Sequence, residues 1–344
     1  MRKVCIFIVC IVALAACNGT NKKYQQSERS GNNLHLAIYD VTFDDYIFTP
    51  TISNDLEKSL ASIFCTGLFR LNPISLEVEN SICTGWDVDN SGLVYTFYID
   101  TTAKFHKDPC FGHKETREVT AYDVKYTFHI LANPEYGGNN FTSTISQIKG
   151  AKKYNAMTKT VRDTSRIEGI KVLNKQTIQV TLEQPSSVFI QKLAHPAASI
   201  IPEEAIKKYG RNSTVSIGPF RYLANETHYI FIKCLFYNGL DENNSKLPYL
   251  DTVFITKTKN FEETITLFTE GQIDAMLLVP NNKIGEVIKQ FPSNIDYEIT
   301  EANYESVNFL GKGPLYNISR RYVKDLHTNR FNILELERTY IKKD

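Results

Sequence analysis

Short stretches of alternating apolar and polar residues recur along the chain and indicate half-buried β-strands. The first such stretch runs from Leu34 to Ile38. A β-hairpin is predicted where residues 86–88 lead into a polar turn and are followed by residues 94–99, which are rich in β-branched and aromatic side chains. A second hairpin is predicted from the same pattern in residues 167–172 and 178–182.

Helical periodicity and capping residues predict four helices among these strands. One helix is expected from about Asn54 to Phe69, and another begins after Thr120, a good N-cap residue. A third follows Pro202, with acidic residues in its first turn and basic residues in its last, an order that suits the helix dipole. The fourth, from Phe261 to Glu270, lies between two further predicted strands. The pattern as a whole predicts a mixed α/β protein.

The N-terminus has the pattern of an export signal. Arg2 and Lys3 precede an apolar run from Val4 to Ala16, which is too short to span a bilayer but typical of the central region of a secretory signal. Small residues before Cys17 resemble the lipobox of bacterial lipoproteins, in which the cysteine is diacylated. We expect residues 1–16 to be a lipoprotein signal peptide, Cys17 to be the lipidation site and residues 17–33 to be a flexible polar tether. An ordinary signal peptide with an incidental cysteine is the alternative.

Composition narrows the function classes. The chain has 344 residues and 42% hydrophobic content, enough for one large domain or two medium lobes. Its 39 basic and 38 acidic residues give a net charge of +1, so no nucleic-acid partner is expected. There is no nucleophile elbow, no phosphate-binding loop and no pair of carboxylates at helical spacing, and the seven histidines are scattered. We therefore expect neither an enzyme nor a bound cofactor.

Four cysteines remain after those of the signal and the anchor, namely Cys65, Cys83, Cys110 and Cys234. Export would permit disulfides, but the sequence does not choose among the three full pairings. Buried free thiols are an equal alternative.

Eight short motifs resemble, in order, the signature of the oligopeptide- and dipeptide-binding proteins of ABC importers, the bacterial extracellular solute-binding proteins of family 5. They are Gly67–Arg70, Gly85–Val88, Gly92–Phe97, Lys104–His106, Val119–Val124, Ile217–Phe220, Leu247–Asp251 and Gly271–Asp274. The resemblance implies a two-lobed, mixed α/β clam shell of the class II periplasmic binding protein type, with an extra subdomain in the first lobe. It also implies a monomeric receptor that encloses a peptide or similar small solute between its lobes and delivers it to a membrane permease. With the N-terminal signal, this places the protein in the cell envelope, lipid-anchored on the periplasmic or extracellular face.

The resemblance divides the chain and leaves it incomplete. We expect a first lobe at residues 34–245, a partial second lobe at 246–325 and a divergent tail at 326–344, with a crossing between lobes at Gly239–Pro248. An unfinished second lobe would expose apolar faces of Ile273–Val279 and Ile284–Phe291. The alternative function is accordingly a truncated lipoprotein that does not transport, either a decayed gene product or a surface or scaffold protein.

Residues 107–118 form an insertion where the family has a short turn. His106, Cys110 and His113, in and beside it, could in principle ligate a metal, but their spacing is not a strong zinc pattern and a fourth ligand is missing. A surface loop without metal is the favoured interpretation.

Candidate ligand-binding residues are Tyr46, Phe48 and Thr51, which lie in the loop after the first strand, where members of the family line the cleft. Ser199 lies near the family's cleft edge and is a further candidate. Trp86 opens a patterned strand and is predicted to belong to the core rather than to a binding site.

Overall fold

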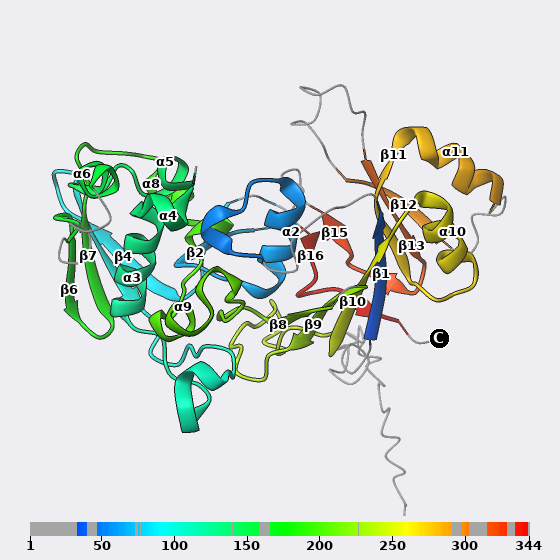
Figure 1. The fold of residues 1–344 in the computed structure, drawn as a ribbon, viewed down its shortest axis with the longest axis horizontal. Coiled ribbons are helices and arrows are strands. Elements are labelled where there is room, and N and C mark those ends of the chain that lie inside the picture. The colour runs from blue at the N-terminus through cyan, green and yellow to red at the C-terminus, as the bar shows by residue number, and fades with distance from the viewer. Residues whose placement is uncertain are drawn as a thin grey trace, which may run out of the picture.

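A seven-stranded mixed sheet contains the predicted first strand, β1 (Asn33–Tyr39), near its centre (Figure 1). The computed structural model describes residues 33–39, 47–72, 75, 77–138, 140–157, 166–225, 227–290, 297–302, 315–328 and 334–342. From edge to edge, the sheet runs β12 (Tyr297–Ala302), β13 (Leu315–Arg320), β11 (Ala275–Pro280), β1, β10 (Thr252–Thr258), β9 (His228–Lys233) and β8 (Phe220–Ala224). β1 pairs in parallel with β10 and β11, and the other pairs are antiparallel.

A four-stranded antiparallel sheet forms the other end of the molecule (Figure 1). It consists of β4 (Cys83–Val88), β5 (Val94–Ile99), β7 (Thr177–Thr181) and β6 (Ile170–Asn174), so both predicted hairpins are confirmed. Three two-stranded ladders complete the strands. They are β2 (Phe69–Leu71) with β3 (Val78–Asn80), β14 (Val323–Lys324) with β17 (Tyr340–Ile341), and β15 (His327–Thr328) with β16 (Leu334–Glu335).

Helices cover both sheets, and α2 lies between the two sheet bodies in Figure 1. The α-helices are α2 (Asp55–Phe64), α3 (Ala121–Ala132), α4 (Pro134–Gly137), α5 (Asn140–Thr144), α6 (Ala151–Ala156), α8 (Phe189–Leu193), α9 (Glu203–Tyr209), α10 (Phe261–Thr269) and α11 (Asn281–Gln290). The 3₁₀ helices are η1 (Thr49–Thr51), η2 (Pro109–Lys114), η3 (Pro196–Ala198) and η4 (Gly210–Asn212).

The predicted helix starts are confirmed by their capping geometry. Asn54 caps α2 and Thr120 caps α3, each in a reciprocal capping box, and the side chain of Asn260 caps α10. The helix expected to reach Phe69 instead ends at Phe64. The reason is that Cys65 adopts an extended conformation, and the chain then enters β2.

One continuous apolar core joins the two sheet bodies. It contains residues of the four-stranded sheet, such as Phe97, residues of α2, such as Phe64, and residues of the seven-stranded sheet, such as Phe231. A second, smaller cluster lies under α10 and α11 and includes Phe268 and Val287. The largest cluster therefore reaches from one sheet to the other.

The expected division between lobes at residues 245 and 246 falls inside the seven-stranded sheet. β9 lies before this boundary and β10 after it, and they are hydrogen-bonded neighbours. β1, from the start of the expected first lobe, pairs along its whole length with β10, from the expected second. The connection Gly239–Pro248 therefore joins two neighbouring strands of one sheet.

The expected exposure of Ile273–Val279 is wrong. These residues contribute to β11, which lies between β1 and β13, and Ile273, Ala275, Met276 and Val279 are at most 2% exposed. In the second stretch, Ile284–Phe291, Val287 is buried whereas Ile288 is 50% exposed and Phe291 lies outside the described residues.

Trp86, which was expected in the core, is 40% exposed. Its cross-strand partner Phe97 and its stacking partner Tyr95, at 6.0 Å between ring centroids, are both buried, so Trp86 lies at the margin of the core-facing side of β4.

The last described segment, residues 334–342, is built into the body. Leu334 and Leu336 are buried in the main core, and the Ser62 hydroxyl of α2 donates to the Leu334 carbonyl at 3.2 Å. The backbone N–H of Tyr249 donates to the carbonyl of Glu337 at 3.3 Å. A tail expected to be divergent, on the basis of its charged and polar composition, thus carries apolar side chains that complete the core.

Two further observations concern thiols and membranes. Cys65, Cys83, Cys110 and Cys234 are free thiols in the structure, as in the interpretation without disulfides.

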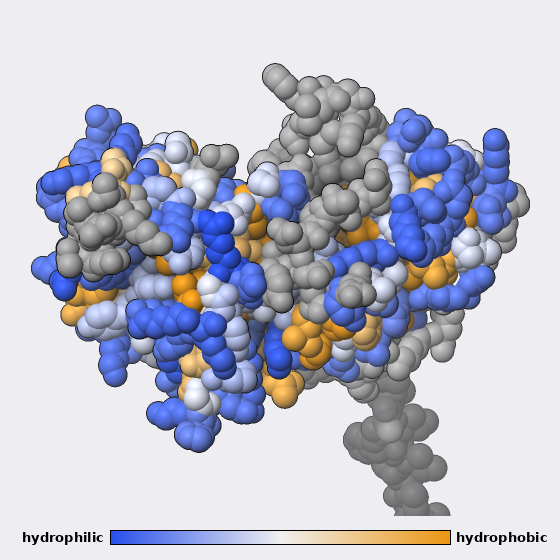
Figure 2. Space-filling model, viewed as in Figure 1, coloured by the Kyte–Doolittle hydropathy of each residue, from blue (hydrophilic) through white to orange (hydrophobic). Residues whose placement is uncertain are grey.

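Hydrophilic residues cover most of the face seen in Figure 2, with smaller apolar areas among them. Within the ranges that the structure describes, none of the helices has the length and apolar character needed to cross a bilayer. The expected signal peptide, Cys17 and the tether up to residue 32 lie outside those ranges.

Candidate functional site

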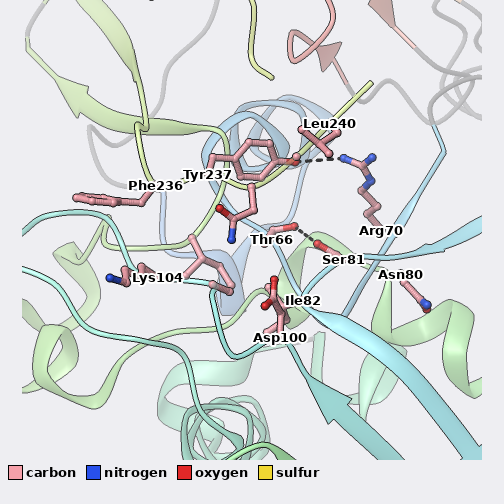
Figure 3. Close-up of a pocket in the computed structure, with 14 residues that line it drawn as sticks. Thr66, Arg70, Asn80, Ser81, Ile82, Asp100, Lys104, Phe236, Tyr237 and Leu240 are labelled. Atoms are coloured by element: carbon pink, nitrogen blue, oxygen red, sulfur yellow. Dashed lines mark hydrogen bonds between the residues drawn. The ribbon is translucent and has the colours of Figure 1, made fainter. Parts of the chain in front are cut away.

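A polar cavity of about 250 Å³ lies beside the end of α2, where β2, β3, the loop after β5 and the connection between β9 and β10 meet (Figure 3). Its polar and charged lining residues are Thr66, Arg70, Asn80, Ser81, Asp100, Lys104, Tyr237 and Asn238. Figure 3 shows Arg70, Lys104 and Asp100 on different sides of the cavity. Side chains of both charges therefore surround one small space.

Local sequence determines how these side chains are placed. Gly67 lies where the chain passes from α2 to β2, and a Cβ atom there would lie 3.1 Å from the Ala198 carbonyl oxygen, so a larger residue would require the neighbouring backbone to shift. Arg70 then follows in β2. Asp100 follows the last residue of β5, and its Oδ1 accepts hydrogen bonds from the backbone N–H and the hydroxyl of Thr102, both at 2.7 Å. This fixes the carboxylate at the cavity wall.

Arg70 is the most constrained charge at the site. Its Nε donates to Glu79 Oε2 at 3.1 Å, and its Nη1 donates to Glu337 Oε2 at 2.9 Å and to the Tyr237 hydroxyl at 3.3 Å. The nearby Glu337 carboxylate raises the pKa of Arg70 above its ordinary value. Burial opposes this effect but is the weaker of the two influences. Arg70 therefore remains a cation.

A second cavity, of about 60 Å³, is also lined by Thr66, Arg70 and Tyr237. Glu337 and the predicted residue Ser199 contribute to its wall. His195 contributes as well, and burial, assisted by the charge of Lys58, lowers the pKa of His195 to about 4. This histidine is neutral at physiological pH, and its Nδ1 accepts a hydrogen bond from the Ala197 N–H at 3.1 Å.

The predicted site residues lie near the smaller cavity, but most of their side chains are occupied. η1, which contains Thr51, packs against η3, which precedes Ser199. Ser199 is 2% exposed and donates to the Pro196 carbonyl at 2.7 Å. Phe48 is 6% exposed and packs in a separate apolar cluster. Thr51 is half-buried and donates to the Phe48 carbonyl at 3.1 Å. Tyr46 lies outside the described residues.

Sequence reasoning missed the charged residues of the two cavities. Arg70 ends the Gly67–Arg70 motif, so a motif signal was present, but nothing in its spacing indicated a buried ion pair. Glu337 has no signal at all, because its partners Arg70 and Tyr237 lie 267 and 100 positions away in sequence.

The expected loop at residues 107–118 holds no metal-ligand cluster. His106 is 2% exposed, and its Nε2 lies 2.9 Å from the Gly218 carbonyl oxygen, an atom of the core backbone. Arg117 instead anchors the loop, donating to Glu204 and Asp123 at 2.7 Å each. No group of three or more His, Cys, Asp or Glu residues is placed to hold a metal ion in the ranges that the structure describes. The arrangement at the cavity is suited to hydrogen bonding and charge pairing with a small polar molecule.

The fold is that of the binding proteins that serve bacterial uptake systems. It is similar to DppA of Helicobacter pylori in complex with the peptide STSA, with a TM-score of 0.62 and 20% identity over 80% of this chain and 52% of that chain. OppA of Listeria monocytogenes bound to peptide gives a TM-score of 0.61 and 16% identity over 79% of this chain and 51% of that chain. The expected mixed α/β class of periplasmic binding proteins is thereby confirmed.

The family model of the bacterial extracellular solute-binding proteins, family 5, matches residues 77–321, and the chain belongs to this family. The glutathione-binding protein GsiB of Salmonella choleraesuis is 26% identical over 253 residues, which are 64% of this chain and 43% of GsiB. Di/tripeptide-binding protein 4 of Pseudomonas aeruginosa is 28% identical over 206 residues, which are 54% of this chain and 36% of that protein. The chain spans about half the length, or less, of the relatives that it matches.

Proposed function

We propose that this protein is the solute-binding component of an ABC importer, which captures a peptide or a similar small solute and delivers it to a membrane permease. The observation that carries this proposal is the family match over residues 77–321. Relatives named for binding glutathione and di- or tripeptides support a peptide-like solute. Their names describe binding, which supports a role without catalysis. A peptide incubated with the protein should therefore be recovered intact by mass spectrometry.

The cavity beside Arg70 is the proposed solute site. Its volume of about 250 Å³ lies just below the usual range of about 300–1,000 Å³ for small-molecule pockets, so it suits a solute no larger than a short peptide. The Asp100 carboxylate can receive an ammonium group. The Lys104 ammonium can pair with a carboxylate, since its contacts with described residues are long, at 3.7 Å to Glu118 and 5.9 Å to the centre of the Phe236 ring. Opposite charges on one small cavity match a zwitterion.

The loop from Tyr46 to Thr51 and Ser199 remain proposed parts of the ligand-binding region. Thr51 is the one described member of the set whose side chain is half-exposed, and because it lines neither cavity it is proposed to contact only a part of the solute that extends beyond them. Phe48 and Ser199 are buried, and they are proposed to hold η1 and η3 in place beside the cavities.

Lipid anchoring through Cys17 is the proposed means of retention in the cell envelope. Metabolic labelling with a radioactive fatty acid should mark the wild-type protein, and Cys17→Ser should abolish the label. A labelled Cys17→Ser variant would refute the anchor.

Calorimetric titration of the purified chain with glutathione and with a panel of dipeptides tests the proposed function. We expect one binding site per chain. Asp100→Asn should reduce the affinity at least tenfold, because the neutral amide no longer pairs with an ammonium group. A tenfold change corresponds to about 1.4 kcal/mol. The control Lys149→Met changes an exposed ion pair with Glu168 elsewhere and should leave affinity unchanged. Absence of heat with a folded sample would instead favour a lipoprotein that does not transport.

A further inference from the structure

The C-terminal segment 334–342 brings a carboxylate to the wall that the two cavities share. Glu337 is 8% exposed, and its Oε2 accepts hydrogen bonds from Arg70 Nη1 and from the Tyr237 hydroxyl, both at 2.9 Å. Its Oε1 lies 3.2 Å from the same Arg70 Nη1. The contact joins the end of the chain to a strand that lies 267 positions earlier.

The two donors that hold Glu337 are suited to carboxylate recognition. A guanidinium has five N–H donors in a planar fork that matches the two oxygens of a carboxylate. In Arg70, Nε is bonded to Glu79 and Nη1 to Glu337 and Tyr237, whereas Nη2 makes no hydrogen bond within the described residues. Arg70 thus keeps unused donor capacity beside the Tyr237 hydroxyl.

The position of these donors links them to the proposed solute site. Arg70 and Tyr237 line both cavities, whereas Glu337 lines only the smaller one. A molecule in the larger cavity therefore borders the same two donors that Glu337 engages from the other side. Figure 3 shows Tyr237 and Arg70 next to each other at the edge of this cavity.

We propose that Arg70 and Tyr237 form a carboxylate-binding subsite, and that Glu337 fills this subsite from within the chain. A solute that carries a carboxylate, such as the C-terminus of a peptide, binds there in exchange for Glu337. The exchange leaves the number of charges around Arg70 unchanged, so this half-buried cation is never left without a carboxylate at Nη1. The inference rests on the proposed function in one respect, since it takes the larger cavity as the solute site.

The test uses the full chain and acetate as the probe, with sodium chloride at equal ionic strength as the reference. Glu337→Ala removes the internal carboxylate and lowers Tm. Acetate should restore Tm in this variant, with an apparent affinity at least tenfold tighter than in the wild type. The double variant Arg70→Ala/Glu337→Ala should show no restoration.

Glu242→Ala is the matched control, because Glu242 also pairs with an arginine across the same C-terminal segment, Arg338, but at an exposed position. Acetate should have no specific effect on it. If Glu337→Ala does not fold, Glu337→Gln preserves the shape of the side chain, and line broadening of ¹³C-acetate reports binding relative to the wild type.

Equal acetate affinity in the wild type and in both Glu337 variants would overturn the inference, as would restoration that persists without Arg70. Peptide titration of the wild type is read separately. If peptides bind but acetate does not restore Tm in Glu337→Ala, the subsite is refuted and the proposed function stands. If acetate restores Tm but no peptide binds, the subsite stands and the proposed function is refuted.

Discussion

Replacing Leu336 with alanine tests whether the C-terminal segment is part of the folded core. Leu336 is 1% exposed and belongs to the main apolar cluster. Truncation of a buried leucine to alanine costs about 2–5 kcal/mol, depending on how far the surroundings collapse into the space. Leu336 directly follows the two-residue strand β16, near the end of the chain, where relaxation is easier than at a sheet centre. We therefore expect a loss of about 2–3 kcal/mol in the free energy of unfolding.

The assay is urea denaturation followed by far-UV circular dichroism, since the half-exposed Trp86 is a weak reporter of the core. The transition midpoint should fall while the slope m stays constant, because the folded state keeps its extent. Leu235→Ala is the matched control. Leu235 is 82% exposed, and its replacement should change stability by less than about 0.5 kcal/mol. If Leu336→Ala is no more destabilising than Leu235→Ala, the segment contributes nothing to the core and our description of it is wrong.

Three further predictions concern stability. Burial lowers the pKa of His106 from 6.5 to about 4, so the unfolded chain takes up the proton at a higher pH than the folded chain does. The free energy of unfolding should therefore fall by roughly 3 kcal/mol as the pH drops from 6.5 to 4. His106→Gln should flatten this pH dependence in urea titrations. Gly218→Ala should destabilise the protein by about 1–3 kcal/mol, since the new Cβ would lie 2.4 Å from the backbone of α2. Gly285→Ala places its Cβ in open space in α11 and should stabilise the protein by about 0.5–1 kcal/mol. Equal effects of the two variants in thermal melts would contradict this. Arg117→Ala should lower the free energy of unfolding by about 1–3 kcal/mol, because it leaves buried Asp123 without its cation. The exposed control Lys207→Ala should lower it by less than about 0.5 kcal/mol. The reverse order of the two losses would refute the anchoring role of Arg117.

Local signals predicted the elements well. Thr120 was predicted as a helix cap, and Asn54 as a helix start, and both cap helices in the structure, because a cap is formed between residues three positions apart. The hairpin at β4 and β5 was predictable for the same reason. Its Asp89 side chain accepts the backbone N–H of Leu93 and Val94, so the turn is encoded within six residues.

Long-range pairing limited the prediction of lobes and site. No local pattern shows that β1 pairs with β10 and β11, more than 200 positions away, so the chain was divided where its composition became polar. The same limit hid the Arg70 site. Phe48 and Ser199 were proposed as ligand contacts because they follow strands and loops near the family's cleft, but their burial depends on apolar neighbours from distant helices.

The most direct test of the central claim is a crystal structure of the chain grown with the peptide that binds best in calorimetry. The account predicts that the peptide lies in the cavity beside Arg70, with an ammonium group within hydrogen-bonding distance of the Asp100 carboxylate. A peptide bound at another surface, with this cavity unchanged, would contradict the account.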